Sequence, residues 1–330
     1  MRPFAYERAE STAAAVGRAA ADPAVAFLAG GTELVAWLKE GISAPRTVLD
    51  LSRLPLDGIH RDGEMLRIGA LARLADVAAN PVVSAVAPAL AQAIDSAASP
   101  QIRAMGTVAG NLLQRTRCPY YRSPTEAPCN KRRPGSGCAA LGGDNRTAAI
   151  LGANERCVAT HPSDLAVALV AVEASVLVEG TDGPRVIPIE ELHAPEPEDP
   201  TRETVLRSGD LITELRVARG RLAEAGCFVK IRDRAAFDFA LVSAAAAVLP
   251  DGDRIGAARV ALGGVAPRPW RCRRAESELV GKTVGLEQIR RAAELDLALA
   301  RPLAQNGFKV ELAVRAVVRA VERSWEAACR

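Results

Sequence analysis

The stretch LAGGTEL, residues 28–34, stands between an apolar segment and an amphipathic one. Residues 25–28 predict a short buried strand, and residues 32–40 predict a helix that Gly41 closes. Adjacent glycines let a backbone approach a bulky anion, and the unpaired N–H groups that open a helix would face it. The spacing matches neither the dinucleotide fingerprint nor a P-loop. On this pattern alone, a plain tight turn capped by Thr32 is an equally good interpretation.

Two other segments have the same character. Residues 106–111, GTVAGN, offer small side chains, a hydroxyl and exposed amides. Residues 160–164, THPSD, stand at a predicted helix start, where Asp164 could accept hydrogen bonds from sugar or ribityl hydroxyls. A helix-capping carboxylate is the simpler interpretation of Asp164 by itself. Three such segments in one chain indicate an extended cofactor more strongly than any one of them does.

Strand and helix patterns alternate in the N-terminal region, whereas the C-terminal part shows strands followed by helices, which together predict an α+β protein. Residues 111–160 are different, because they are rich in Arg, Pro, Gly, Asn and Cys and show little periodicity. Such a long irregular stretch inside a compact domain needs a function or a metal to hold it. Residues 194–209 are polar and proline-rich and predict a surface loop. The other predicted helices cover residues 13–21, 71–79, 85–97, 163–172, 275–280, 286–299 and 309–328, and the other predicted strands cover residues 47–51, 65–70, 174–179, 185–189, 210–217, 227–232, 242–249 and 255–262.

Seven cysteines are present, and an odd number argues against a disulfide framework. Four of them fall in the irregular segment with the spacing C-x10-C-x8-C-x18-C: Cys118, Cys129, Cys138 and Cys157. This spacing matches neither a short zinc pattern nor a compact ferredoxin pattern. An iron–sulfur cluster, a structural zinc site and unrelated thiols are all compatible with it. Several cations and glycines flank the four positions, as a cluster would require: Arg115, Arg117, Lys131, Arg132, Arg133, Arg146 and Arg156, with Gly135, Gly137, Gly142, Gly143 and Gly152.

Composition excludes several other classes of protein. A formal net charge of +3 and an aromatic content of 4% do not favour binding to nucleic acid. No run of 18 apolar residues is present, so we expect no membrane span. The first twelve residues, MRPFAYERAEST, contain no apolar core of a secretory signal, so we expect no leader.

Five segments together resemble a known family, the FAD-binding subunits of molybdenum hydroxylases, which include the xanthine dehydrogenase and carbon monoxide dehydrogenase flavoproteins. The segments are AGGTELVAWLKEG (29–41), MGTVAGNLLQRTRCPYYRS (105–123), CNKRRPGSGCAALGGDNR (129–146), CVATHPSDLAVAL (157–169) and FVKIRDRAAFDFALVSAAAAV (228–248). The cysteine-rich insertion resembles aldehyde oxidoreductase flavoproteins that carry an additional [4Fe-4S] cluster. Xanthine dehydrogenases have only a short connection at this point, which argues against nicotinamide reduction here.

The resemblance implies a two-part FAD-binding domain of the vanillyl-alcohol-oxidase (PCMH) type over residues 1–222, with lobes at about 1–56 and 57–222 and an insertion at about 111–160. A C-terminal αβ domain of the CO dehydrogenase flavoprotein type would follow over residues 223–330. The implied FAD contacts are Phe27, Leu28, Ala29, Gly30, Gly31, Thr32, Glu33, Leu34, Thr107, Ala109, Gly110, Asn111, Asp164, Ile212 and Lys230. The implied cluster ligands are Cys118, Cys129, Cys138 and Cys157.

The implied function is electron transfer, with no catalytic acid–base residue in this chain. A large subunit with the molybdenum cofactor would hydroxylate an aldehyde or heterocycle, a small [2Fe-2S] subunit would relay electrons, and this chain would pass them to a soluble acceptor. Two other interpretations are a stand-alone flavin oxidase and a non-enzymatic, zinc-organised scaffold. We expect a cytoplasmic protein, or a periplasmic one if a partner's twin-arginine signal exports the folded complex.

Overall fold

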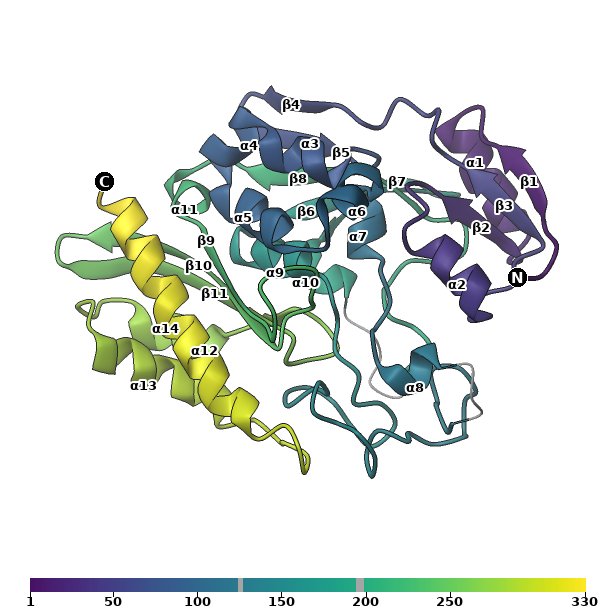
Figure 1. Ribbon diagram of the computed structural model, residues 1–330. Coiled ribbons are helices and arrows are strands. Elements are labelled where there is room, and N and C mark those ends of the chain that lie inside the picture. Colours follow the sequence, from purple (N-terminus) through teal and green to yellow (C-terminus); the bar gives the residue numbers. More distant parts are fainter. Residues whose placement is uncertain (124–126, 194–198) are drawn as a thin grey trace.

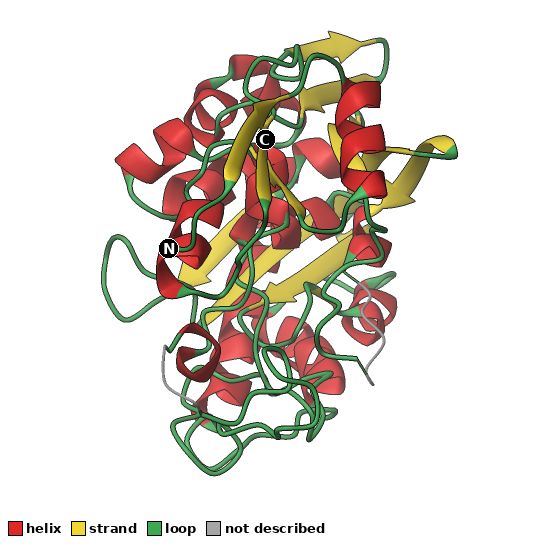
Figure 2. Ribbon diagram, turned by 90° about the vertical axis from the view of Figure 1, so that its right-hand side faces the viewer, coloured by secondary structure: helices red, strands yellow, loops and turns green. Residues whose placement is uncertain are grey.

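The structure, a computed structural model, describes residues 1–123, 127–193 and 199–330. The prediction of a surface loop over residues 194–209 therefore falls partly outside the described residues, and so does a short part of the insertion. The described chain forms three sheets, each with its own helices (Figures 1 and 2). No helix among the described residues is long and apolar enough to cross a membrane.

The N-terminal lobe contains a three-stranded parallel sheet in the order β1-β3-β2. Parallel strands need crossover connections, and a helix after each of the first two strands supplies them. The second of these helices ends at Gly41, which adopts φ 69° in the left-handed region. The elements are β1 (Ala5–Arg8), α1 (Thr12–Ala21), β2 (Val25–Leu28), α2 (Leu34–Glu40) and β3 (Thr47–Asp50).

The second lobe is a five-stranded antiparallel sheet in the order β4-β5-β8-β6-β7, with short helices packed on it. Its strands come from both sides of the insertion, so the lobe is complete only when distant segments pair. The strands are β4 (Ile59–Asp62), β5 (Met65–Gly69), β6 (Ser175–Gly180), β7 (Gly183–Pro188) and β8 (Leu211–Ala218). The helices are α3 (Leu74–Ala79), α4 (Pro81–Val86), α5 (Pro88–Ser96), α6 (Pro100–Met105), α7 (Val108–Leu112), α9 (Asp164–Ala171) and α10 (Ile189–Leu192).

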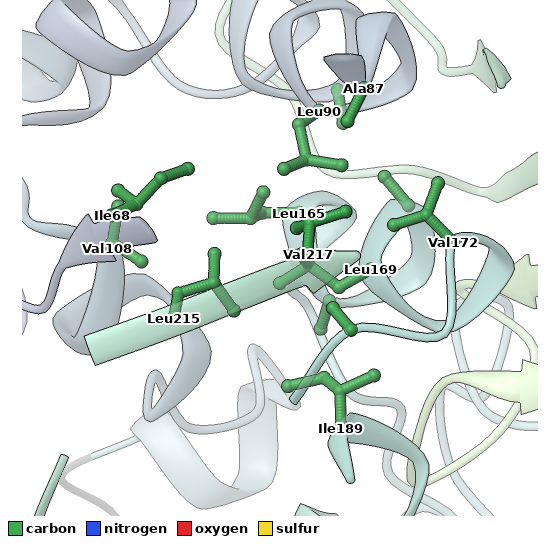
Figure 3. Packing of buried hydrophobic residues seen from close by; sticks show 14 of the residues in the cluster. Ile68, Ala87, Leu90, Val108, Leu165, Leu169, Val172, Ile189, Leu215 and Val217 are labelled. Atoms are coloured by element: carbon green, nitrogen blue, oxygen red, sulfur yellow. The ribbon is translucent and has the colours of Figure 1, made fainter. Parts of the chain in front are cut away.

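Helix α9 lies at the centre of the molecule, and all of its residues are buried. A helix that is apolar on every side has to be covered on every side. Figure 3 shows Leu165 and Leu169 of this helix among side chains from α5 and β8. The same core takes in Ala245 from the C-terminal sheet. This helix therefore joins the second lobe to the C-terminal part of the chain.

The C-terminal part is a four-stranded antiparallel sheet in the order β12-β11-β10-β9, with helices against one face. In β10, Ala245 packs toward the second lobe, while Ala244 and Ala246 pack toward the C-terminal helices, as the alternation of a strand requires. The elements are α11 (Arg221–Glu224), β9 (Cys227–Ile231), β10 (Val242–Asp251), β11 (Arg254–Gly263), β12 (Trp270–Arg271), α12 (Arg273–Leu279), α13 (Leu286–Leu297) and α14 (Phe308–Ala328).

The insertion leaves α7 and returns at α9, and among its described residues the one helix is α8 (Pro119–Arg122). Figure 1 shows this teal segment beneath the sheets, between α2 and the start of α14. Its backbone accepts hydrogen bonds from Lys309 of α14, through the carbonyls of Thr147 and Ala148, both at 2.9 Å. Lys309 also donates to the carbonyl of Gly264, which directly follows β11, at 2.7 Å. The insertion is therefore anchored on the C-terminal part of the chain.

Several predictions of secondary structure are wrong, and the helix predicted over residues 71–79 begins only at Leu74. A single helix over residues 85–97 is not present, because α4 and α5 are separated at Ala87, which has φ −149° and ψ 69°. Pro88 causes the break, since it has no N–H and restricts the residue before it. The helix predicted from Thr32 begins later, at Leu34. Strand β4 was not predicted, because its sequence IHRD is polar and mostly exposed.

Candidate cofactor site

The two glycines of the first loop have different roles. A Cβ on Gly30 would lie 1.9 Å from the carbonyl oxygen of Met105 and 3.1 Å from the Cα of Gly106. Gly31 has φ +73°, whereas a Cβ there would meet only ordinary contacts. Gly30 therefore lets the first loop touch the backbone just before the second loop, and Gly31 supplies the turn.

The second loop is fixed by its own side chains. Thr107 is 3% exposed and caps α7, and its hydroxyl accepts a hydrogen bond from the N–H of Gly110 at 3.3 Å. Asn111 accepts a hydrogen bond from the hydroxyl of Ser163 through its Oδ1, at 2.6 Å. Ser163 in turn caps α9. The second and third segments of the sequence pattern are thus joined directly.

Asp164 and Lys230 form a buried ion pair. The Lys230 Nζ lies 2.7 Å from Asp164 Oδ2, and the two side chains are only 3% and 5% exposed, respectively. Lys230 also donates to the carbonyl of Ser96 at 3.2 Å. Burial raises the pKa of Asp164, and the ammonium of Lys230 opposes that rise. The pair links α9 to β9, which places one charged group from each half of the chain at the same point.

These three segments surround one cavity of about 390 Å³. A volume in this range, with a few convergent polar groups in an apolar wall, is typical of a site for a small molecule or cofactor. Residues that the sequence did not assign to this site complete the wall, including Gln114, Arg117, Arg122, Phe237 and Phe239. The predicted cofactor residues that line it are Thr32, Glu33, Thr107, Gly110, Asn111, Asp164 and Lys230.

The remaining predicted cofactor residues do not line this cavity. Those of the first loop and strand β2 lie behind its wall, where Phe27 and Ala29 pack against one small core and Leu28 and Leu34 against another. Ile212 is 2% exposed and lies in the core of the second lobe. Gly30, Gly31 and Ala109 are the other predicted cofactor residues that do not line the cavity. The structure therefore brings together the polar part of the predicted site, while most of the apolar residues support it.

The four cysteines of the insertion converge. Cys118, Cys129, Cys138 and Cys157 all line one small cavity of about 10 Å³, although they are far apart in the chain. The backbones of Cys129 and Cys138 pair as an antiparallel bridge. Cys129 is buried and the other three are half-buried. The other cysteines lie elsewhere: Cys227 and Cys272 are buried, and Cys329 is exposed.

A single zinc ion and an iron–sulfur cluster would require different distances between the four sulfurs. Among the described residues, no group of three or more His, Cys, Asp or Glu side chains is arranged to hold a metal ion. A single zinc would need its sulfurs about 2.3 Å away, and so near one another, whereas the thiolates of a cubane each bind a different iron and stand farther apart. Burial raises the pKa of Cys118 to about 11 and also raises that of Cys157. Thiolates at this site therefore need a cationic partner, which bound iron or zinc would provide.

Most of the cationic side chains around the cysteines form ion pairs with carboxylates. They are therefore not free positive charges facing a cluster. Arg115 and Lys131 both contact Glu203, at 2.5 Å and 2.9 Å. Arg117 contacts Glu33 at 2.7 Å. Further along, Arg146 contacts Asp233 at 2.7 Å. Sequence could show the density of cations but not the acids that meet them.

The cysteine cavity and the larger cavity adjoin. A third cavity, of about 170 Å³, is lined by both Cys118 and Asp164. Arg117 lines this cavity and the larger one. Residues 157–164 run directly from one predicted cluster ligand to the buried ion pair. The two predicted cofactor sites are therefore neighbours in space.

Two histidines lie beside this connection: His193 is buried and His161, from the third candidate segment, is half-buried. The ring centres of His161 and His193 are 4.3 Å apart. Nε2 of His193 lies 2.8 Å from the carbonyl oxygen of Leu112. This contact requires the neutral tautomer with the proton on Nε2, which donates to the carbonyl. Burial lowers the pKa of His193 to about 4 and that of His161 well below its usual value. Both rings are therefore neutral at physiological pH.

The fold and the site define a flavoprotein, and comparison with known proteins identifies the class. Residues 2–219 match the FAD binding domain in molybdopterin dehydrogenase, and residues 228–324 match the CO dehydrogenase flavoprotein C-terminal domain. The chain belongs to this family of FAD-binding subunits of molybdenum hydroxylases, whose members are oxidoreductase subunits. The predicted fold class is confirmed.

Individual relatives agree with this assignment. The chain is 43% identical over 317 residues to the aldehyde oxidoreductase FAD-binding subunit PaoB of Escherichia coli (strain K12), and the match covers 96% of each chain. It is 26% identical to the carbon monoxide dehydrogenase medium chain of Hydrogenophaga pseudoflava, over 91% of this chain and 88% of that one. A solved carbon monoxide dehydrogenase from the same organism superposes with a TM-score of 0.77 and 25% identity, over 99% of both chains.

Proposed function

We propose that this chain is the FAD and [4Fe-4S] electron-transfer subunit of a heterotrimeric, molybdenum-containing aldehyde oxidoreductase. In this proposal electrons reach it from a large molybdenum-cofactor subunit through a small [2Fe-2S] subunit, and they leave to a soluble acceptor. The aldehyde is inferred from the named activity of the relative that shares 43% identity. The domain boundary predicted near residue 222 would separate the FAD-binding part from the C-terminal part.

The observation that carries the proposal is the convergence of Cys118, Cys129, Cys138 and Cys157 on one cavity beside the cofactor cavity. Four half-buried or buried thiols from a segment with little regular structure line the same small cavity. A [4Fe-4S] cluster requires four thiolates in such an arrangement. The metal would also help to order the irregular segment, since ligand bonds would add to its small apolar core around Ala140, Ala148 and Val158.

FAD, when bound, exchanges electrons singly and in pairs. The residues of this chain would hold it in place rather than react with it. The buried Asp164 is placed to accept hydrogen bonds from hydroxyls of the cofactor, and the ammonium of Lys230 opposes the rise in the pKa of this carboxyl that burial causes. Thr107 and Asn111 would add a hydroxyl and an amide on the opposite segment. None of the described groups in the cavity wall is arranged as a nucleophile with its base.

Iron, acid-labile sulfide and flavin analysis of protein purified without oxygen tests this proposal. We expect about four irons and one FAD per chain, as a cubane with four ligands requires, and a brown protein with a flavin shoulder in its spectrum. Low-temperature EPR after reduction should show a signal from the cluster. About one zinc and no iron would overturn the cluster, and a purely yellow protein would favour a stand-alone flavin oxidase.

Partners form a separate test. A tagged chain should co-purify with a molybdenum-cofactor subunit and a [2Fe-2S] subunit from its own cells. If the isolated chain oxidised an aldehyde with a dye acceptor as fast as any complex does, it would have its own substrate site and the subunit assignment would be wrong. Fractionation of the cells would decide between a cytoplasmic location and export on a partner's twin-arginine signal.

A further inference from the structure

The carboxylate of Glu33 lies where the first glycine loop meets the insertion. It accepts hydrogen bonds from the Trp37 indole at 2.8 Å and from the backbone N–H of Arg115 at 3.1 Å. It also contacts the guanidinium groups of Arg117 at 2.7 Å and Arg122 at 2.5 Å. The Glu33 side chain is only 14% exposed. One carboxylate of the N-terminal lobe therefore receives four donors, three of which come from the insertion.

The three insertion residues surround the first predicted cluster ligand. Arg115 and Arg117 precede Cys118, and Arg122 follows it at the end of α8. Arg122 also folds back and donates to the carbonyls of Thr116 at 2.9 Å and Arg115 at 3.2 Å. Residues 115–122 are thus closed into a compact arm around Cys118. We call this segment the Cys118 arm.

Arg117 occupies the boundary between the two predicted cofactor sites. It lines the large cavity and also the cavity that reaches Cys118. Its guanidinium lies 4.8 Å from the ring centre of Phe239 at the rim of the cofactor cavity, and it donates to the side chain of Gln114 at 3.0 Å. Glu33 is the one carboxylate in ion-pair contact with Arg117 among the described residues.

Glu33 and Glu203 form ion pairs with different arginines of the Cys118 arm. Arg115 contacts Glu203, and Arg122 has a second, weaker contact with Glu40 at 3.4 Å. Loss of the Glu33 charge would therefore leave Arg117 without a neutralising partner, beside both cavities. A free cation at partly buried sites acts over a longer range than one in water, because the surroundings screen it less.

We propose that Glu33 is a positioning residue that couples the flavin site to the cluster site. It holds the Cys118 arm against the glycine loop, and it sets the electrostatic potential at both centres by neutralising Arg117. This inference rests on the proposed function. It assigns Glu33 a role distinct from the direct FAD contact that the sequence implied.

The test is a redox titration of the purified complex with a Glu33→Gln variant. Glutamine keeps the shape and an oxygen for the Trp37 donor but removes the charge. An uncompensated Arg117 favours the more negative, reduced form of each centre, so the midpoint potentials of the flavin and the cluster should both shift upward. The double variant Glu33→Gln, Arg117→Gln should return both potentials toward the wild-type values, since it removes the freed charge as well.

Glu7→Gln is the matched control, because Glu7 lies in the same lobe and pairs with Arg18 away from the insertion. It should leave both potentials unchanged. Unshifted potentials in a Glu33→Gln protein that retains its iron and flavin would overturn the inference, and a shift in only one centre would overturn the coupling. Should Glu33→Gln fail to fold, Arg117→Gln alone decides, since it must lower both potentials. Wild-type protein without iron would overturn the proposed function and the coupling with it, whereas unshifted potentials in protein with full iron and flavin would overturn the inference alone.

Discussion

The second lobe and the insertion are held together in opposite ways. In the second lobe, Leu165 and Leu169 of α9 pack among apolar side chains from α5 and β8, so the lobe is stabilised mainly by apolar burial (Figure 3). In the insertion the anchors are polar and belong to other parts of the chain: Glu33 on one side and Lys309 on the other. A segment of this kind has little reason to order by itself, and a bound metal would supply one.

The largest expected effect comes from the cluster ligands. Replacing Cys138 by Ser should abolish most of the bound iron, because a serine oxygen is a harder and less readily ionised ligand than a thiolate. The insertion should then become sensitive to protease while the second lobe stays resistant, which would sharpen the contrast between them. Iron content, EPR and limited proteolysis measure this.

Cys329→Ser is the control for that experiment, because Cys329 is an exposed thiol outside the insertion. It should keep its iron and its resistance to protease. FAD should survive in the Cys138 variant, since Lys230 and Gly31 lie outside the insertion. Full iron occupancy in the Cys138 variant would remove this residue from the ligand set.

The next effect concerns the glycine loop. Gly30→Ala should lower FAD occupancy severely, because the new methyl group would lie 1.9 Å from the Met105 carbonyl and would force the two loops apart. The cost of such overpacking is about 1–3 kcal/mol or more. Flavin absorbance per chain and thermal unfolding measure it. Gly17→Ala in α1 is the control, because nothing lies within 4 Å of a Cβ at that position. Alanine favours a helix more than glycine does, so we expect this variant to be stabilised by about 0.5–1 kcal/mol. A Gly30→Ala protein with full FAD would show that the contact is dispensable.

A third prediction breaks the anchor on the other side of the insertion. Lys309→Met should lower the free energy of unfolding by about 2–4 kcal/mol, because it leaves buried carbonyl acceptors of Thr147, Ala148 and Gly264 unpaired. Urea unfolding and hydrogen exchange near residues 145–151 measure it. The exposed Lys282→Met is the control and should change little. An unchanged midpoint would mean that the insertion does not depend on this contact.

The last effect concerns the pH dependence of stability, and it appears only below about pH 6.5. His193 has an ordinary pKa of 6.5, which burial lowers to about 4. Between those values the unfolded chain binds a proton that the folded chain does not, so stability falls as pH decreases from 6.5 to 4, by about 3 kcal/mol from this residue. Above 6.5 its contribution is constant. Urea midpoints measured across this range for wild type and His193→Gln should diverge, with a flatter profile in the variant. A His60→Gln protein should follow wild type, and parallel profiles for His193→Gln would contradict the prediction.

Periodic segments could be predicted from the sequence, and irregular ones could not. Strand 25–28 and the hairpin around Gly183 follow from apolar patterning and turn chemistry, and the structure has both. A single helix over residues 85–97 is not formed, because Pro88 interrupts a pattern that is otherwise helical. Nothing periodic marks where residues 113–162 run, since their partners are single side chains elsewhere in the chain.

The candidate site divides in the same way. Asp164, Lys230 and Thr107 could be singled out from motifs and resemblance, and the structure puts them around one cavity. Glu33 contacts three residues of the insertion. These contacts join segments far apart in the sequence, so no local sequence pattern predicts them. The contact between His161 and His193 lacked a signal as well, since the two residues are far apart in the sequence and a lone histidine has no distinctive spacing.

The position of Lys309 also bears on the order of events during synthesis. It bonds to the carbonyl of Thr147 from 162 residues further along the chain, whereas Glu33 precedes the insertion by more than eighty. A nascent insertion can therefore reach its first anchor long before its second anchor has been translated. At the ribosome's pace of roughly 5–20 residues per second, that interval lasts on the order of ten seconds. If the four thiols bind the proposed cluster, its iron and sulfide could be delivered during this time, before Lys309 fixes the backbone at Thr147 and Ala148.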